Sequence, residues 1–135
     1  MKALPKTLKI LGLSLYVLAI VGVLVFAIPA TGWRALSVQT GSMTPAIRPG
    51  ALVIVHDIPA TKLKVDDVIT YKSSTVPNET ITHRITQINY QSGSIYNVIT
   101  KGDANKGADT PVVPKQIVGR VTSHIPVLGT ISDWL

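Results

Sequence analysis

The chain of 135 residues has no cysteine. Disulfide frameworks, thiolate metal sites and cysteine nucleophiles are therefore excluded. Acidic residues are also few, with 7 Asp and Glu against 13 Lys and Arg, which gives a net charge of +6. The basic residues are scattered along the chain rather than gathered in a stripe, so the excess points to a lipid bilayer as partner and argues against nucleic acid.

Charged residues are missing from one long stretch, residues 10–30, which reads "ILGLSLYVLAIVGVLVFAIPA". As a helix rising ~1.5 Å per residue it spans roughly 30 Å, the thickness of a bilayer's hydrocarbon core. The stretch therefore predicts one transmembrane helix. Three lysines lie in residues 1–9, so the positive-inside rule predicts a cytoplasmic N-terminus and an extracytoplasmic remainder. A cleaved signal peptide is the rival interpretation, disfavoured because its apolar core has only ~7–15 residues.

Short runs rich in Val, Ile, Thr and Tyr follow, and they predict β-strands at 51–58, 67–73, 80–90, 94–100 and 116–125. Turn residues separate these runs, and "QSGS" predicts a hairpin between the third and the fourth. The fold class is therefore mainly β, with a single, mostly antiparallel domain over residues 31–125. The apolar tail 126–135 is too short to span a bilayer; it either packs on the domain, lies at the membrane interface or begins a second membrane segment.

His83 is the most informative histidine. Strict alternation in "ITHRI" places Ile81, His83 and Ile85 on one face of the predicted strand. A histidine on an apolar face is either a core residue with local hydrogen-bond partners, which the pattern alone favours, or a general base kept neutral by partial burial. His56 and His124 also lie in strand-like runs, and the local sequence does not separate them from His83.

Ser42 and two aspartates complete the set of candidate residues. Ser42 lies in "QTGSMTPAIRPG", which has no G-x-S-x-G elbow, so the pattern alone favours a turn residue over a nucleophile. The loop "KGDANKGADT" contains Asp103 and Asp109, and such loops usually hold turn-capping or solvated carboxylates. Its spacing does not fit an EF-hand, so we expect no metal. In the sharper interpretation, one aspartate orients an imidazole in a Ser-His-Asp arrangement.

Four segments after the apolar stretch resemble, in order, the boxes of the type I signal peptidases, the membrane-bound serine proteases that remove signal peptides from exported proteins. "SVQTGSMTPAIRPG" is similar to the nucleophile box and "DVITYKS" to the strand that follows it. "THRITQI" is similar to the general-base box, and "TKGDANKGADTPVVPKQIVGRV" to the closing Gly-Asp loop and strand. Together they cover most of residues 37–121.

The resemblance implies a role for each candidate residue. Ser42 matches the nucleophile, and His83 matches the base that takes its proton. Asp109 matches the aspartate that holds the imidazole, and Asp103 is implied to be a second essential acid or an organiser of the loop. The backbone N–H of Ser42 and the hydroxyl of Thr40 are the implied donors to the oxyanion.

The signal peptidases occur in two styles that differ in the base. The common bacterial style uses lysine, whereas the style of the endoplasmic reticulum, archaea and some Gram-positive bacteria uses histidine. The residue before Arg84 is His83, so the resemblance implies the histidine style, and Lys64 and Lys72 are the nearest lysines to a base site. A histidine base predicts activity that rises through about pH 6 to 7. Asp66 stands where the family often has glycine.

The implied activity is that of a membrane-bound serine endopeptidase that removes N-terminal signal peptides after small residues, in an Ala-x-Ala pattern. The implied partners are preproteins that carry signal peptides, together with a secretion translocase or accessory subunits, and no cofactor is implied. The implied location is the cell membrane or the membrane of the endoplasmic reticulum. Because an extended chain covers at most ~3.5 Å per residue, the short segment between the predicted helix and Ser42 keeps the nucleophile near the membrane surface.

Two other functions are compatible with parts of the pattern. A non-catalytic, membrane-anchored β module that assists surface-fibre assembly or another peptidase would keep the fold without a reactive Ser42. A self-cleaving serine protease of the LexA-like type fits less well, because the sequence predicts a membrane helix and no DNA-binding domain.

Overall fold

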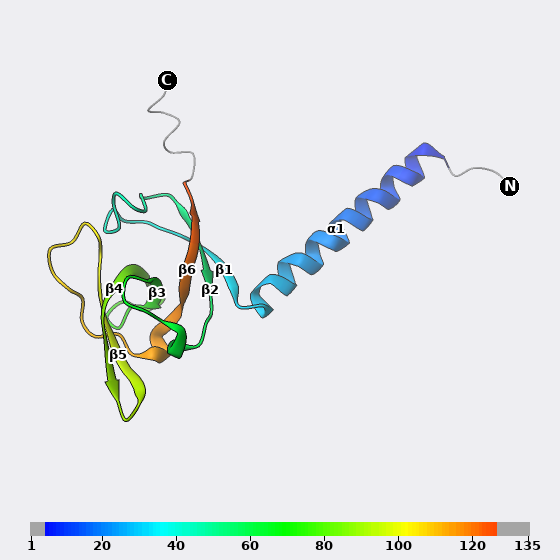
Figure 1. Ribbon diagram of the computed structural model, residues 1–135. Coiled ribbons are helices and arrows are strands. Elements are labelled where there is room, and N and C mark those ends of the chain that lie inside the picture. Colours follow the sequence, from blue (N-terminus) through cyan, green and yellow to red (C-terminus); the bar gives the residue numbers. More distant parts are fainter. Residues whose placement is uncertain (1–4, 127–135) are drawn as a thin grey trace, which may run out of the picture. The chain divides into compact units, whose positions relative to one another are not determined.

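The computed structural model describes residues 5–126 and divides into two units, which meet in the sequence between Gly32 and Trp33 (Figure 1). The first unit is the helix α1, Lys6–Ala30, which begins earlier than the predicted span. It is long and apolar enough to cross a membrane, and apolar side chains such as Leu18 are exposed along it. An exposed helix that is apolar on all sides is typical of a membrane span. Beyond Pro126, the predicted tail lies outside the described residues.

The second unit is built on one antiparallel sheet. Its six strands are arranged in the order β1-β2-β6-β3-β4-β5. The bounds are β1 Trp33–Ser37, β2 Leu52–His56, β3 Val68–Lys72, β4 Thr80–Gln91, β5 Ser94–Lys101 and β6 Ile117–Ile125. β6, the last in sequence, lies between β2 and β3 and pairs antiparallel with both. These pairings confirm the predicted mainly β, antiparallel fold.

The strands β2 to β6 lie where the sequence predicted them, whereas β1 was missed. The segment "WRALS" has no alternation that marks a strand, and it becomes extended by pairing with β2 from Trp33 opposite His56 to Ser37 opposite Leu52. The hairpin between β4 and β5 is confirmed. Its turn residues Ser92 and Gly93 both have positive φ, as a two-residue hairpin turn of type I′ requires.

Two hydrophobic clusters support the sheet. The first contains Val38, Met43, Ile47, Ala51, Val53 and Val55. The second contains Leu63, Ile69, Tyr71, Ile85, Val98 and Val112. The first cluster involves β2 and the segments that flank it, and the second involves β3, β4 and β5. The geometry of a site that takes residues from both clusters therefore depends on the packing around β2 and on the packing around β3, β4 and β5.

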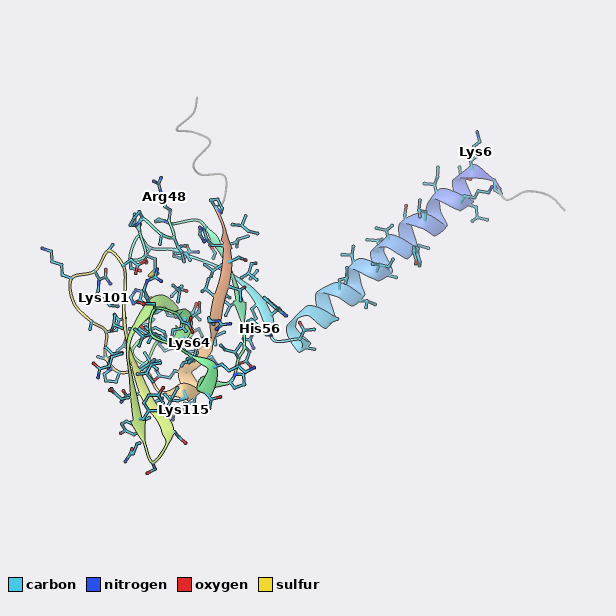
Figure 2. The ribbon with its side chains drawn as sticks, in the orientation of Figure 1. Lys6, Arg48, His56, Lys64, Lys101 and Lys115 are labelled. Atoms are coloured by element: carbon cyan, nitrogen blue, oxygen red, sulfur yellow. The ribbon has the colours of Figure 1, made fainter. Side chains whose placement is uncertain are left out.

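Within residues 5–126, the labelled basic side chains of the β domain do not gather in one patch. Figure 2 shows Arg48, Lys64, Lys101 and Lys115 on different parts of the β domain. This distribution agrees with the scatter along the sequence and is unlike the basic stripe of a nucleic-acid-binding surface.

Candidate active site

Ser42 lies in a tight turn after β1, and its neighbour anchors that turn. Met43 is completely buried in the first hydrophobic cluster. The Thr44 N–H donates to the Gly41 carbonyl, and the Ile47 N–H donates to the Met43 carbonyl. The methionine that follows the serine is therefore a core residue, and its burial holds Ser42 at the surface of the cluster.

His83 comes from β4 and sits on the second cluster. It is 7% exposed, and its neighbours on the same strand face, Ile81 and Ile85, pack in that cluster. The ring of Tyr71 stands edge-on to the imidazole, with 6.5 Å between the ring centroids. The alternation in the sequence thus placed His83 on the apolar face, where packing restricts its rotation.

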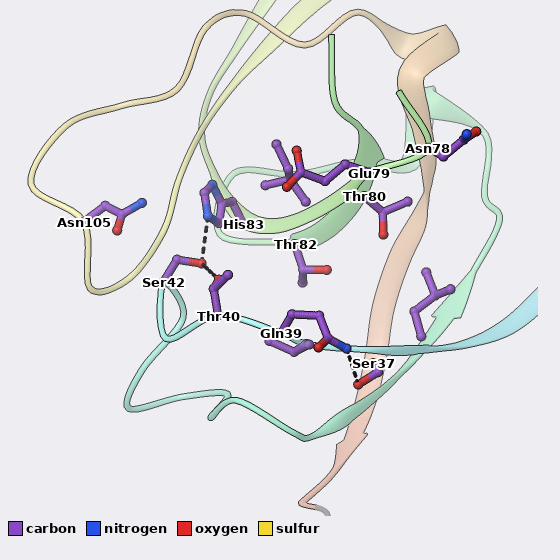
Figure 3. A pocket seen from close by; sticks show the side chains of 13 residues that line it. Ser37, Gln39, Thr40, Ser42, Asn78, Glu79, Thr80, Thr82, His83 and Asn105 are labelled. Carbon is purple, nitrogen blue, oxygen red and sulfur yellow. Dashed lines mark hydrogen bonds between the residues drawn. The ribbon is translucent and has the colours of Figure 1, made fainter. Parts of the chain in front are cut away.

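The structure brings Ser42, His83 and Asp109 into one hydrogen-bonded chain. The Ser42 Oγ lies 3.0 Å from His83 Nε2, a contact drawn in Figure 3. On the other side of the ring, Nδ1 lies 2.5 Å from Asp109 Oδ2. Because an ionised carboxylate only accepts hydrogen bonds, Nδ1 carries a proton, and Nε2 of a neutral ring is left to accept from the serine hydroxyl. This arrangement can activate a serine for attack on a carbonyl.

Asp103 makes different contacts. Its carboxylate accepts two hydrogen bonds from Arg84, with Nε 2.9 Å from Oδ1 and Nη2 2.8 Å from Oδ2. These bonds hold the pKa of the Asp103 carboxyl below its usual value. Arg84 follows His83 directly in β4, so the ion pair ties the closing loop to the strand that bears the imidazole. Of the two roles implied for Asp103, this position favours that of loop organiser.

The other histidines lie away from this chain of contacts. His56 stacks on Trp33, with 4.2 Å between the ring centroids, and His124 belongs to β6. Asp66, which stands where the family often has glycine, has φ +77°. That left-handed conformation is natural for glycine and tolerated by aspartate, so the backbone of this turn suits either residue.

Two buried hydroxyls next to Asp109 were missed by the sequence reasoning. Thr100 Oγ1 lies 2.7 Å from Asp109 Oδ2, and the Tyr71 hydroxyl lies 3.3 Å from the same oxygen. The sequence contains one pattern that could have indicated Thr100. In "NVITK" the alternation puts Val98 and Thr100 on one face, and a polar residue on a core-facing position needs a partner.

The closing loop also contacts the backbone of Ser42. The Ala104 N–H donates to the Ser42 carbonyl oxygen at 2.9 Å. At Gly102, an added Cβ would lie 2.7 Å from that same carbonyl oxygen and 2.7 Å from Asn105 Nδ2. Backbone of the loop and backbone of the Ser42 turn are therefore in direct contact, with no room for a side chain at Gly102.

Gly102→Ala is expected to slow the labelling of Ser42 by a serine-directed acylating probe by about 10- to 100-fold, because the methyl group displaces the Ser42 carbonyl and an error of ~1 Å at a reacting group has an effect of this size. Gly107→Ala in the same loop is the matched control, since a Cβ there meets nothing within 4 Å. Initial rates with both variants check the prediction. Equal rates for the two variants would show that the contact does not position the serine.

A cleft of about 430 Å³ opens in front of Ser42 and His83. Apolar side chains along its walls include Leu36, Val38 and Ile81, and polar ones include Thr40 (Figure 3). The lining comes from two segments, residues 36–42 and 78–83, together with Asn105. The first segment ends at Ser42 and the second at His83, so the cleft extends from these two residues back along both segments.

One wall of the cleft is the beginning of β4, a free strand edge. β5 pairs with β4 only from Arg84 onward, so the first residues of β4 have β3 on one side and no strand on the other within the described chain. The Ser73 N–H donates to the Glu79 carbonyl. Because backbone groups alternate sides in an antiparallel pair, those of Thr80 and Thr82 point away from β3, toward the open side.

The opposite wall has a second free edge. β1 is the terminal strand of the sheet and pairs with β2 alone. The Val38 N–H donates to the Ala51 carbonyl at 2.9 Å, so by the same alternation the backbone groups of Ser37 and Gln39 point away from β2. An extended peptide in the cleft therefore finds hydrogen-bonding backbone on both sides.

Metal chemistry has no ready donor set here. Within residues 5–126, no group of three or more His, Cys, Asp or Glu side chains is arranged to hold a metal ion. Every buried side-chain nitrogen and oxygen in that part of the chain has a hydrogen-bond partner.

Comparison with known proteins identifies the family. No family model matches the chain. It is 32% identical over 127 residues to the signal peptidase complex catalytic subunit SEC11 of Lachancea thermotolerans, with 76% of this chain and 73% of that protein covered. It is 28% identical over 125 residues to the SEC11 subunit of Zygosaccharomyces rouxii, with 76% and 72% covered. Signal peptidase I W of Bacillus subtilis is 38% identical over 88 residues, which cover 64% of this chain and 45% of that protein. Together with the fold and the order of the site residues, these similarities show that the chain belongs to the signal peptidase family.

Proposed function

We propose that the protein is a serine endopeptidase that removes N-terminal signal peptides from exported preproteins. The observation that carries this proposal is the chain of contacts from the Ser42 hydroxyl through His83 to Asp109, placed at the end of an open cleft. The relatives named above are signal peptidases. A non-catalytic β module would have no need of this arrangement.

In the proposed mechanism, His83 Nε2 takes the proton of the Ser42 hydroxyl while its oxygen attacks the carbonyl carbon of the scissile bond. Asp109 accepts from Nδ1 and stabilises the imidazolium that forms. The imidazolium then gives the proton to the leaving amine, and a water molecule repeats the sequence to release the acyl group from the serine. The backbone N–H of Ser42 and the hydroxyl of Thr40 donate to the oxyanion.

The signal peptide is proposed to enter the cleft as an added strand. Residues before the scissile bond would lie between the two free edges, bonded to the backbone of Ser37 and Gln39 on one side and of Thr80 and Thr82 on the other. Since both edges run toward the catalytic pair, the peptide would run parallel to both. Side chains near the bond would meet the apolar wall that contains Ile81, and the proposed preference for small residues such as alanine follows from the resemblance to the signal peptidases.

Location and partners form part of the same proposal. We assign residues 10–30 to the membrane, residues 1–9 to the cytoplasm and the domain 31–125 to the extracytoplasmic side, in the cell membrane or that of the endoplasmic reticulum. The tethered domain then meets cleavage sites as they emerge from the bilayer. The SEC11 relatives are named as catalytic subunits of a complex, and accessory subunits or a secretion translocase are proposed partners here.

The test uses the full chain in detergent micelles with a labelled preprotein that carries Ala-x-Ala before the cleavage site. The expected result is a mature product whose N-terminus follows the second alanine, and loss of that product when this alanine is replaced by phenylalanine, because the proposed specificity admits only small side chains next to the scissile bond. An intact preprotein after prolonged incubation with the wild-type chain would contradict the proposal and favour the non-catalytic module.

Thr40→Val is expected to lower kcat by about 10²-fold, the usual effect of removing one oxyanion donor. The Thr40 hydroxyl lies 3.1 Å from the Ser42 Oγ, so it is close to the reacting atoms, and valine keeps its shape without the donor. Thr40→Ser, which retains the hydroxyl, is the control and is expected to stay within a few-fold of the wild type. An unchanged kcat in Thr40→Val would remove this residue from the oxyanion hole.

A further inference from the structure

Asp109 is held by more than the imidazole. Three groups contact its Oδ2: His83 Nδ1 at 2.5 Å, Thr100 Oγ1 at 2.7 Å and the Tyr71 hydroxyl at 3.3 Å. A carboxylate can only accept, so both hydroxyls donate to it. One oxygen atom thus receives the imidazole proton and two further hydrogen bonds.

The two hydroxyls are buried and come from different strands. Thr100 of β5 is completely buried, and Tyr71 of β3 is 4% exposed. Burial raises the pKa of Tyr71 to about 12, so its phenol stays protonated and remains a donor at any working pH. The two hydroxyl oxygens also lie 3.3 Å from each other, but a carboxylate has no proton to give, so both hydroxyls can donate to Asp109.

Thr100 holds Asp109 at two points. Its carbonyl accepts the Asp109 N–H at 2.8 Å, and its hydroxyl donates to the Asp109 carboxylate. Both the backbone and the side chain of Asp109 are therefore hydrogen-bonded to β5, although Asp109 itself lies in a loop. Tyr71 also restricts the imidazole of His83, because its ring stands edge-on to that imidazole at an interplanar angle of 71°.

We propose that Thr100 and Tyr71 are positioning residues of the proteolytic reaction, which fix Asp109 Oδ2 opposite His83 Nδ1 and so hold the imidazole in line with Ser42. The inference rests on the proposed function. Neither residue lines the cleft, so neither meets the substrate, and both act through Asp109. Their removal is therefore expected to change the chemical step and to leave peptide binding as it is.

Thr100→Val in the full chain is the first test, because valine keeps the shape and removes only the hydroxyl. We expect kcat for the labelled preprotein to fall by about 10- to 100-fold, the range for a hydrogen bond to a charged group, with KM unchanged. Thr100→Ser is expected to restore most of kcat. Thr70→Val is the matched control: Thr70 is equally buried, but its hydroxyl bonds Thr82 and not Asp109.

The decisive measurement repeats Thr100→Val in an Asp109→Ala background, in single turnovers over long incubations. If Thr100 acts through Asp109, the second substitution adds less than about 2-fold, because contacting residues that act as a unit are not additive. A loss that persists undiminished in that background, a Thr100→Ser variant as slow as Thr100→Val, or an unchanged kcat in Thr100→Val would each overturn the inference.

Tyr71→Phe provides a second, independent arm if Thr100→Val does not fold. It keeps the ring against His83 and removes the longer of the two hydroxyl bonds, so a smaller loss of about 2- to 10-fold in kcat is expected; no loss would overturn the assignment of Tyr71. Failure of the proposed function itself would be distinct from all these outcomes, since the wild-type chain would then leave the preprotein uncut.

Discussion

Preprotein processing by Ser42→Ala is expected to fall by roughly 10⁴- to 10⁶-fold, the effect of removing a serine nucleophile from a catalytic triad. The Ser42 Oγ is the atom that contacts His83 Nε2, and no other hydroxyl in the described contacts takes that place. The turn itself is held by buried Met43 and by the bond from the Ala104 N–H to the Ser42 carbonyl. Alanine leaves both intact, so the variant should unfold at the temperature of the wild type.

Two measurements make that result specific. Ser123→Ala, an exposed serine of β6 outside the cleft, is expected to process the preprotein at the wild-type rate. A serine-directed acylating probe should label the wild type and Ser123→Ala and fail to label Ser42→Ala. Normal processing by a correctly folded Ser42→Ala variant would end the proteolytic account and leave a membrane-anchored β module.

His83→Ala is expected to have an effect of similar size, again roughly 10⁴- to 10⁶-fold in kcat. Without the imidazole, no group receives the serine proton, and Asp109 loses the partner that it orients. The double variant with Ser42→Ala should be no slower than Ser42→Ala alone, because members of a triad act as a unit. Rates measured at a fixed pH with the labelled preprotein check both statements.

Lys64→Ala and Lys72→Ala test the competing lysine base. Neither lysine lines the cleft: Lys64 lies in the turn before β3, where its backbone N–H donates to Asp67, and Lys72 is the last residue of β3. Both variants are therefore expected to keep wild-type activity. Loss of processing in either lysine variant, together with normal processing in His83→Ala, would assign the base to lysine and exclude the histidine mechanism.

Much of the fold was predictable because most strands carry a local signal. β2 to β6 are rich in β-branched residues and bounded by turn chemistry, and the apolar helix is evident from composition. β1 could not be found in this way, since "WRALS" is extended only because β2 pairs with it. The position of β6 between β2 and β3 is likewise a long-range pairing, and no local pattern encodes the order of strands in a sheet.

The candidate site was predictable in part, and mainly through resemblance. The local sequence pattern alone favoured a turn residue for Ser42 and a core residue for His83. The order of the four segments that resemble the signal peptidases reversed both preferences. The structure places these two side chains with Asp109, while their catalytic roles stay predictions. The contacts of Thr100 and Tyr71 join β5, β3 and a loop, so they depend on tertiary packing that the linear pattern does not contain.

The unpaired strand edges beside the cleft bear on how many different preproteins one such enzyme can accept. Backbone amides and carbonyls are common to every peptide. A peptide bound between β1 and β4 through its main chain is therefore bound almost independently of its sequence. Discrimination then falls on the few side chains next to the bond that is cut. An enzyme that binds its substrates in this way would accept leader peptides of very different sequence and would select only for one or two residues next to the scissile bond.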